Sequence, residues 1–304
     1  MGANSSIWVI EGPRPICIRR VQWSKQDNRA DMTMTIDKNP VANSLGKSKC
    51  FRELALKYAF APSAVLIRTA ETELLSALPM EPPVLDLCCG DGYFCSLIRP
   101  EGVEVGCDMS MQALKNARER GLYNGLACAD IGKGIPFRDK VFQTVVCNSS
   151  LEHVKNVDAA LREISRVMKP KGKLYTTFAS HYAYEWWPCG PNALKRYLSY
   201  QPVYNYFPLE QWEQRMAIAG LRVVGHQYYL SKAAARLLMF LDYHFSHIYM
   251  TSDRTLARPF VRGMRIVPPK IWSTLWGKMF SRIKITATDQ GGGILIIAER
   301  VGLE

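Results

Sequence analysis

A glycine-containing turn is the first feature of this sequence that could do chemistry. Residues 84–88, Val-Leu-Asp-Leu-Cys, are predicted to form a buried strand, and Gly90 and Gly92 follow it directly before a predicted helix over 93–98. Glycine lets the backbone approach a ligand closely, and the first helical turn offers unpaired N–H groups to a carboxylate or phosphate. A nicotinamide-binding turn would carry a third glycine three residues after Gly92, where this sequence has Cys95. The turn therefore predicts a ligand site that is not an NAD site.

Acidic residues lie in or directly after three successive predicted strands, at Asp86, Asp108 and Asp130. Asp108 follows Asp86 by 22 residues, a position from which a carboxylate can accept the hydroxyl hydrogens of a ribose. Asp130 is placed to accept from the exocyclic amine of an adenine, with Met109 and Ile131 as apolar plates for the ring faces. Taken alone, Asp108 could instead cap the following helix. Together the three residues indicate a nucleoside site at the carboxyl edge of a sheet.

The elements that must position these residues alternate regularly. Buried strands are predicted over 84–88, 103–107, 126–129, 143–148, 173–178 and 221–230, the last paired with 293–300. Helices are predicted over 51–78 in two pieces divided by Pro62, and over 93–98, 111–120, 157–168 and 209–219. Strands separated by helices of this length imply parallel pairing and a three-layer α/β sheet. The aromatic stretch 181–207 shows no regular period.

Residues 231–288 form a basic, aromatic insert before the last strand. They contain ten Lys or Arg and two Asp, and so account for +8 of the chain's net charge of +12. Cations mixed with Trp, Phe and Leu suit an anionic membrane surface, and equally suit a lid whose aromatic face is core. Nucleic acid is not expected as a partner, because Leu and Met are abundant in this segment. The expected organisation is a loosely ordered tail over 1–49 and one domain over 50–304.

Cysteine usage and hydropathy indicate the compartment. Nine cysteines are an odd number, and none has zinc-ligand spacing, so neither a disulfide framework nor a metal knuckle is predicted. No run approaches the ~20 apolar residues that a membrane span needs. We expect a cytoplasmic protein, with peripheral membrane contact left open.

Several ordered motifs together resemble one enzyme family. They are 84–92 (Val-Leu-Asp-Leu-Cys-Cys-Gly-Asp-Gly), Val-Gly-Cys-Asp at 105–108, Ala-Asp-Ile at 129–131, the segment 141–154 and the segment 161–173. This pattern is similar to the class I S-adenosylmethionine (SAM)-dependent methyltransferases, in the group with small-molecule and lipid substrates. The resemblance implies a Rossmann-like sheet, mostly parallel with an antiparallel last strand, and SAM as cofactor.

The resemblance also assigns the cofactor residues. It implies that Asp86, Cys88 and the turn from Gly90 to Gly92 hold the methionine part of SAM. It further implies that Asp108 holds the ribose, that Met109, Asp130 and Ile131 hold the adenine, and that Asn148 faces the methyl donor. Cys88 departs from the commoner glycine of the family.

The segment after the fourth strand holds the catalytic candidates. His153 is the first candidate for a base that takes a proton from the acceptor, and His181 is the second. Glu152 and His153 could instead only order the loop. A related branch holds a divalent metal with Glu-x-x-Glu-His, but Ser149 replaces the first Glu here, so no metal is predicted.

The sequence therefore predicts in-line methyl transfer from SAM to a hydrophobic or lipid-like acceptor. Two alternatives stay open: a soluble methyltransferase for a polar or aromatic metabolite, and a catalytically silent SAM-binding module. An Asn/Asp-Pro-Pro-Tyr motif for attack by a base amine is absent, which argues against a nucleic-acid substrate.

Overall fold

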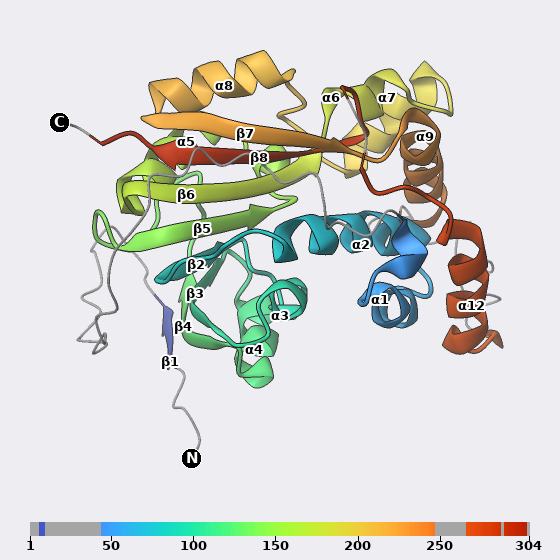
Figure 1. The fold of residues 1–304 in the computed structure, drawn as a ribbon, viewed down its shortest axis with the longest axis horizontal. Coiled ribbons are helices and arrows are strands. Elements are labelled where there is room, and N and C mark those ends of the chain that lie inside the picture. The colour runs from blue at the N-terminus through green and yellow to red at the C-terminus, as the bar shows by residue number, and fades with distance from the viewer. Residues whose placement is uncertain (1–5, 10–43, 247–265, 287–288, 303–304) are drawn as a thin grey trace.

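The strands of the protein form one eight-stranded sheet (Figure 1). The computed structural model describes residues 6–9, 44–246, 266–286 and 289–302. The strands are β1 (Ser6–Val9), β2 (Val84–Leu87), β3 (Val103–Asp108), β4 (Tyr123–Cys128), β5 (Phe142–Asn148), β6 (Met168–Ala179), β7 (Leu221–Tyr229) and β8 (Gly293–Arg300). Their order is β1-β4-β3-β2-β5-β6-β8-β7, and β8 runs in the direction opposite to that of the other seven strands. The predicted mostly parallel sheet with an antiparallel last strand is confirmed.

Helices cover both faces of this sheet, which gives three layers (Figure 1). One face packs against α2 (Pro62–Ser76), α3 (Tyr93–Ile98) and α4 (Met111–Arg120), and the other against α5 (Val157–Val167) and α8 (Leu209–Ile218). The alternation along β2 shows why: Val84 belongs to the first core, and Leu85 and Leu87 to the second. A short helix α1 (Phe51–Lys57) precedes α2. Pro62 begins α2, as its sequence position predicts.

Helix α4 illustrates how local sequence sets the element boundaries. The Ser110 hydroxyl accepts from the N–H of Ala113 at 3.3 Å and so caps the helix start. Gly121 ends the helix with φ 70°, in the left-handed region that glycine adopts without steric cost. The side-chain cap at Ser110, two residues after the end of β3, therefore fixes the start of α4.

The aromatic stretch 181–207 differs from the expectation of irregular structure. It contains the helices α6 (His181–Glu185) and α7 (Pro191–Tyr200). Their aromatic side chains Tyr184 and Tyr197 form a small core with Met239 of a later helix, α9 (Lys232–Leu241). A contact between segments so distant in the chain leaves no periodic pattern in the local sequence.

The basic insert also has regular structure where the structure describes it. It contains α9, a π-helical turn η3 (Asp242–Ser246) and α12 (Pro269–Phe280), and α12 lies beside α1 at one end of the molecule (Figure 1). Four of its ten basic residues, Arg254, Arg258, Arg262 and Arg265, lie in 247–265, outside the described residues, as does Phe260. Among the described residues, no helix has the length and apolarity needed to cross a bilayer.

Two parts of the expected tail over 1–49 have defined places. Strand β1 pairs in parallel with β4 at the edge of the sheet. Residues 44–49 pack on the main body, because Leu45 is fully buried and its N–H donates to the carbonyl of Ile283 at 2.9 Å. The packed region therefore begins before residue 50.

Candidate active site

The turn after β2 has the geometry expected of a ligand-binding bend. Gly90 and Gly92 have φ values of 55° and 72°, and Cys88 has φ 61°, so all three occupy the left-handed region. A Cβ at Gly90 would meet nothing within 4 Å, whereas a Cβ at Gly92 would lie 2.7 Å from the Tyr123 ring. Gly90 therefore faces open space, and Gly92 is required by packing beneath the turn.

Asp108 at the end of β3 is tied to this turn. Its Oδ2 accepts from the N–H of Gly90 at 2.9 Å, and its Oδ1 accepts from the N–H of Ser110 at 2.8 Å. The Asp108 carboxylate thus both caps the turn before α4 and contacts the glycine turn after β2. Met109, the next residue, is 71% exposed and so presents an apolar side chain to solvent beside the turn.

Asp86 lies underneath the turn. Its side chain is buried, and its Oδ2 accepts from the Tyr123 hydroxyl at 2.5 Å. Burial raises the pKa of Asp86 to about 6, against the opposing effect of hydrogen bonds from Tyr123 and Cys95. This carboxylate supports the bend from the protein side. Tyr123 was not predicted as a site residue, since the third strand was expected to begin three residues later, at 126.

The predicted adenine residues are placed unequally. Asp130 Oδ1 accepts from the N–H of Gly132 at 3.0 Å, and Oδ2 pairs with Lys133 Nζ at 3.1 Å. This carboxylate therefore stabilises the turn that follows it in the chain. Ile131 is buried in the second core and offers little surface to a ring. Of the two predicted apolar plates, Met109 is the accessible one.

A buried carboxylate that the sequence analysis missed connects four elements. Glu71 of α2 is fully buried. Its Oε1 accepts from Ser149 Oγ (2.5 Å), Tyr229 Oη (3.1 Å) and Thr177 Oγ1 (3.3 Å), and its Oε2 from Arg68 Nη1 (2.7 Å) and Asn148 Nδ2 (3.2 Å). The predicted residue Asn148 therefore points into this network. A glutamate on the apolar face of a helix, between Ala70 and Leu74, was the available signal.

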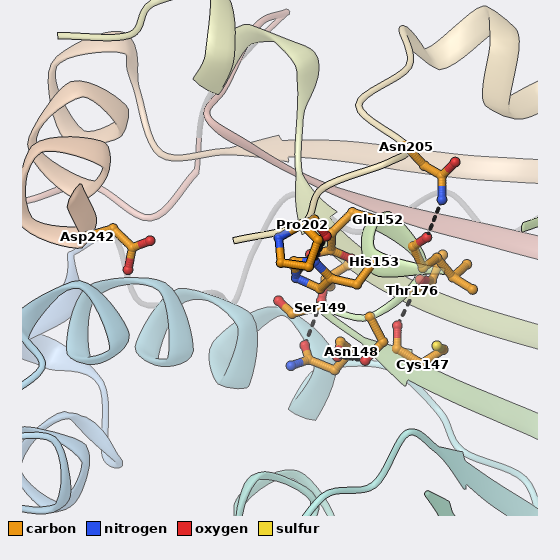
Figure 2. A network of polar contacts seen from close by, with 12 residues as sticks. Cys147, Asn148, Ser149, Glu152, His153, Thr176, Pro202, Asn205 and Asp242 are labelled. Atoms are coloured by element: carbon orange, nitrogen blue, oxygen red, sulfur yellow. Dashed lines mark hydrogen bonds and ion pairs between the residues drawn. The ribbon is translucent and has the colours of Figure 1, made fainter. Parts of the chain in front are cut away.

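A cavity of about 180 Å³ opens beside this network. Helix α2, the segment after β5 and the helices α6, α7 and α9 contribute to its wall, which includes Arg68, Ser149, Glu152, His153, Leu238 and Met239. Figure 2 shows Asp242 at the end of α9 facing His153 and Glu152 from the opposite side. Charged groups thus line one part of the cavity and apolar side chains of α9 another.

Glu152 and His153 share the short 3₁₀ helix η2 (Leu151–His153) on the cavity wall. Glu152 is buried, and its Oε2 has no hydrogen-bond partner among the described residues. Burial raises the pKa of Glu152 to about 8, and the charge of Glu71 acts in the same direction. Its carboxyl is therefore mostly protonated at pH 7.

Burial lowers the pKa of His153, although its contact with the carbonyl of Pro202 acts in the opposite direction. Nδ1 lies 2.8 Å from this carbonyl oxygen, which can only accept, so Nδ1 carries the proton and Nε2 presents a lone pair (Figure 2). Nε2 is 3.9 Å from Oε1 of Glu152. The neutral imidazole can accept a proton next to a carboxyl that is not yet charged.

The second catalytic candidate lies elsewhere. His181 begins α6, with its ring 3.9 Å from that of Tyr182 and its Nε2 3.8 Å from Glu185 Oε1. It is not among the residues that line the described cavity. The structure therefore brings together Asn148, Glu152 and His153, and leaves His181 outside this group.

Comparison with known proteins agrees with this architecture. Residues 85–176 match the family model of a methyltransferase domain. The chain is 28% identical over 170 residues to a demethylmenaquinone methyltransferase of Streptomyces griseus, across 52% of this chain and 73% of that protein. It is 31% identical over 152 residues to one of Listeria monocytogenes, across 47% and 63% respectively. A third, from Corynebacterium kroppenstedtii, is 36% identical over 110 residues, across 36% of this chain and 46% of its own length. The chain thus spans between about half and three quarters of these relatives.

Solved structures share the fold. A SAM-dependent methyltransferase from Thermotoga maritima superposes with a TM-score of 0.50 at 16% identity, across 83% of this chain and 99% of that chain. The cyclase SpnF superposes with a TM-score of 0.51 at 20% identity, across 77% and 82%. Because one of these proteins is a cyclase, the fold alone does not define the reaction. The domain match and the curated relatives carry that assignment. On this evidence residues 85–176 match a methyltransferase domain, and the chain is similar in sequence and fold to the class I SAM-dependent methyltransferases.

Proposed function

We propose that this enzyme transfers the methyl group of SAM to a small acceptor with an apolar body and an acidic hydroxyl, bound in the cavity beside His153. SAM supplies an electrophilic methyl group when bound. On the protein side, the Gly90 turn admits the cofactor, Asp108 binds the ribose, Asp130 lies on the adenine side and Met109 covers the ring. The open space at Gly90 and the 71% exposure of Met109 support this placement.

The observation that carries the acceptor assignment is the pairing of a neutral base with an apolar wall. Glu152 and His153 line one part of the cavity, with Nε2 of His153 3.9 Å from Oε1 of Glu152, and Leu238 and Met239 of α9 line another. The apolar wall suits a hydrocarbon body, and the polar wall suits a single ionisable oxygen. Several relatives are named for demethylmenaquinone, a lipid-like acceptor of this type.

Proton removal falls to His153 in this proposal. At pH 7 the Glu152 carboxyl, with a pKa of about 8, is mostly protonated and cannot act as a base. The imidazole of His153 is neutral, and its free Nε2 accepts the acceptor's proton as the oxygen or conjugated carbon attacks the methyl group. A base within hydrogen-bond reach is worth roughly 10²–10⁴-fold in rate.

Arg68 stabilises the anion formed in that step. Its Nη1 is paired with Glu71 at 2.7 Å, and Arg68 is one of the residues that line the cavity. A guanidinium fixed on one side presents its remaining N–H groups in a defined direction. Arg68 therefore orients an anionic oxygen of the acceptor towards the methyl donor.

The test is methyl transfer from labelled SAM to matched acceptors. We expect turnover with a hydroxylated naphthalene or quinol ring that carries an isoprenoid tail, less with the tail-free ring, and none when the hydroxyl is blocked. His153→Ala should lower kcat by about 10²-fold or more while the Kd for SAM stays within about twofold. Turnover of polar amines only, or a wild-type rate in His153→Ala, would falsify the proposal.

A further inference from the structure

Helix α12 carries apolar side chains on its outer surface as well as its inner one. Its inner face is core, where Trp276 and Phe280 are buried. Outside it, Ile271, Leu275 and Met279 are 58%, 47% and 41% exposed. A spacing of four residues places these three side chains in one stripe along the helix. A monomer gains nothing in stability from such a stripe left in water.

Cations accompany this stripe. Lys270, Lys278, Arg282 and Lys284 are all exposed, and none of the four forms an ion pair within the described part of the chain. The sequence from 254 to 288 has no Asp or Glu at all. On a helical projection, Lys278 falls next to Ile271 and Leu275, and Arg282 follows two residues after the end of the helix. The outer surface of α12 thus combines an apolar stripe with uncompensated positive charge.

We infer that this surface of α12, comprising Ile271, Leu275, Met279 and the flanking Lys278 and Arg282, docks on an anionic phospholipid bilayer. A soluble polyanion would pair with the cations and leave the apolar stripe in water. A neutral apolar protein would cover the stripe and bury the cations without partners. An anionic bilayer interface satisfies both, because apolar side chains enter the acyl boundary while cations meet headgroups.

The docking surface is connected to the acceptor cavity through one short path. The Trp276 indole N–H donates to the carbonyl of Ala59 at 2.8 Å, in the turn between α1 and α2. Ser63, in the first turn of α2, lines the cavity only four residues later. Figure 1 shows α12 beside α1, the helix that directly precedes α2. The inference thus deepens the proposed function, on which it rests for the lipid-like nature of the acceptor.

Vesicle flotation of the full chain tests this inference. We expect flotation with phosphatidylcholine vesicles that contain phosphatidylserine, and little with phosphatidylcholine alone. High salt should weaken it, because exposed charges are screened. Leu275→Ser with Met279→Ser, and separately Lys278→Glu with Arg282→Glu, should each weaken binding at least about tenfold, since each cation near the surface is worth about 1 kcal/mol.

The matched control is Ile218→Ser, which removes a 79% exposed apolar side chain from the end of α8, on the opposite face of the sheet. It should bind vesicles as the wild type does. All the substituted residues are exposed, so unchanged circular dichroism and melting are expected in each variant.

The inference would be overturned by equal flotation with neutral vesicles, by wild-type binding in both double variants, or by a dimer that Leu275→Ser with Met279→Ser converts to monomer. The last would assign the surface to a second copy of the chain. Absence of flotation in an enzyme that still methylates a tailed ring would refute the docking alone. Flotation without transfer to any ring acceptor would refute the proposed function alone.

Discussion

Glu152 and His153 are adjacent residues, and burial shifts their pKa values in opposite directions from the ordinary values. Burial disfavours the charged form of each group, so it raises the pKa of the acid to about 8 and lowers the pKa of the base. Both side chains are therefore neutral at pH 7. A proton taken by His153 would create an imidazolium 3.9 Å from Oε1, which favours ionisation of the neighbouring carboxyl.

Glu152→Gln should remove an inflection near pH 8 from the dependence of kcat on pH. In the wild type we expect kcat to rise through about pH 8, because the ionised Glu152 then stabilises the imidazolium form of His153. Glutamine has the same shape and stays neutral, so the variant should be flat in that range. The measurement is kcat against pH at saturating SAM and acceptor. An unchanged inflection in the variant would show that another group titrates there.

The same substitution should also change how the free energy of unfolding depends on pH. The folded-state pKa of Glu152, about 8, is above its ordinary value of 4.5, so the folded state holds the proton more tightly than the unfolded state. Its contribution to stability is complete below pH 4.5 and is lost as the pH rises through 8. Urea unfolding should show the wild type losing stability over this window relative to Glu152→Gln.

At the scale of elements, Glu71 fixes α2 against the carboxyl ends of three strands. Its carboxylate accepts from Asn148 and Ser149 at the end of β5, from Thr177 of β6 and from Tyr229 of β7. Helix α2 also supplies Arg68 to the cavity. The position of this cavity wall thus depends on one buried side chain.

Glu71→Gln should loosen that attachment. Glutamine has one acceptor oxygen in place of two and cannot pair with Arg68, so buried donors lose partners at a cost of about 1–3 kcal/mol in the free energy of unfolding. The control is Glu73→Gln on the same helix, where the side chain is half-buried and lies outside the network. We expect a lower urea midpoint for Glu71→Gln only. Equal midpoints would mean that the network adds no net stability.

Elements and site differ in how far the sequence could predict them. The buried strands and the glycine turn were predicted because their apolar runs and turn residues are local signals. Parallel strands end at one edge, so Asp108 could be placed beside the turn without coordinates, and its bond to the N–H of Gly90 agrees. Glu71 could not be placed, because its donors come from segments up to 158 residues away. Helices α6 and α7 were missed for the same reason, since their aromatic side chains pack on α9.

At the scale of the whole molecule, cofactor binding and folding are linked. A ligand that binds only the folded state raises its stability by about 2.7 kcal/mol at a concentration of 100 Kd. Asp108→Ala removes the carboxylate proposed for the ribose, so SAM at the same concentration should raise its Tm much less than that of the wild type. Glu101→Ala removes an exposed carboxylate after α3 and serves as the control. Equal SAM-induced shifts in Asp108→Ala and the wild type would refute the ribose assignment.

The hydrogen bond from Trp276 to Ala59 could make the enzyme's activity depend on whether α12 is bound to a membrane. A helix pressed against a bilayer would hold the turn that starts α2, and with it the rim of the cavity that begins at Ser63. The protein would then show interfacial activation, in which lipid alone speeds the methylation of a water-soluble acceptor. Such an enzyme would consume SAM mainly at the membrane in which a lipid-like acceptor is dissolved.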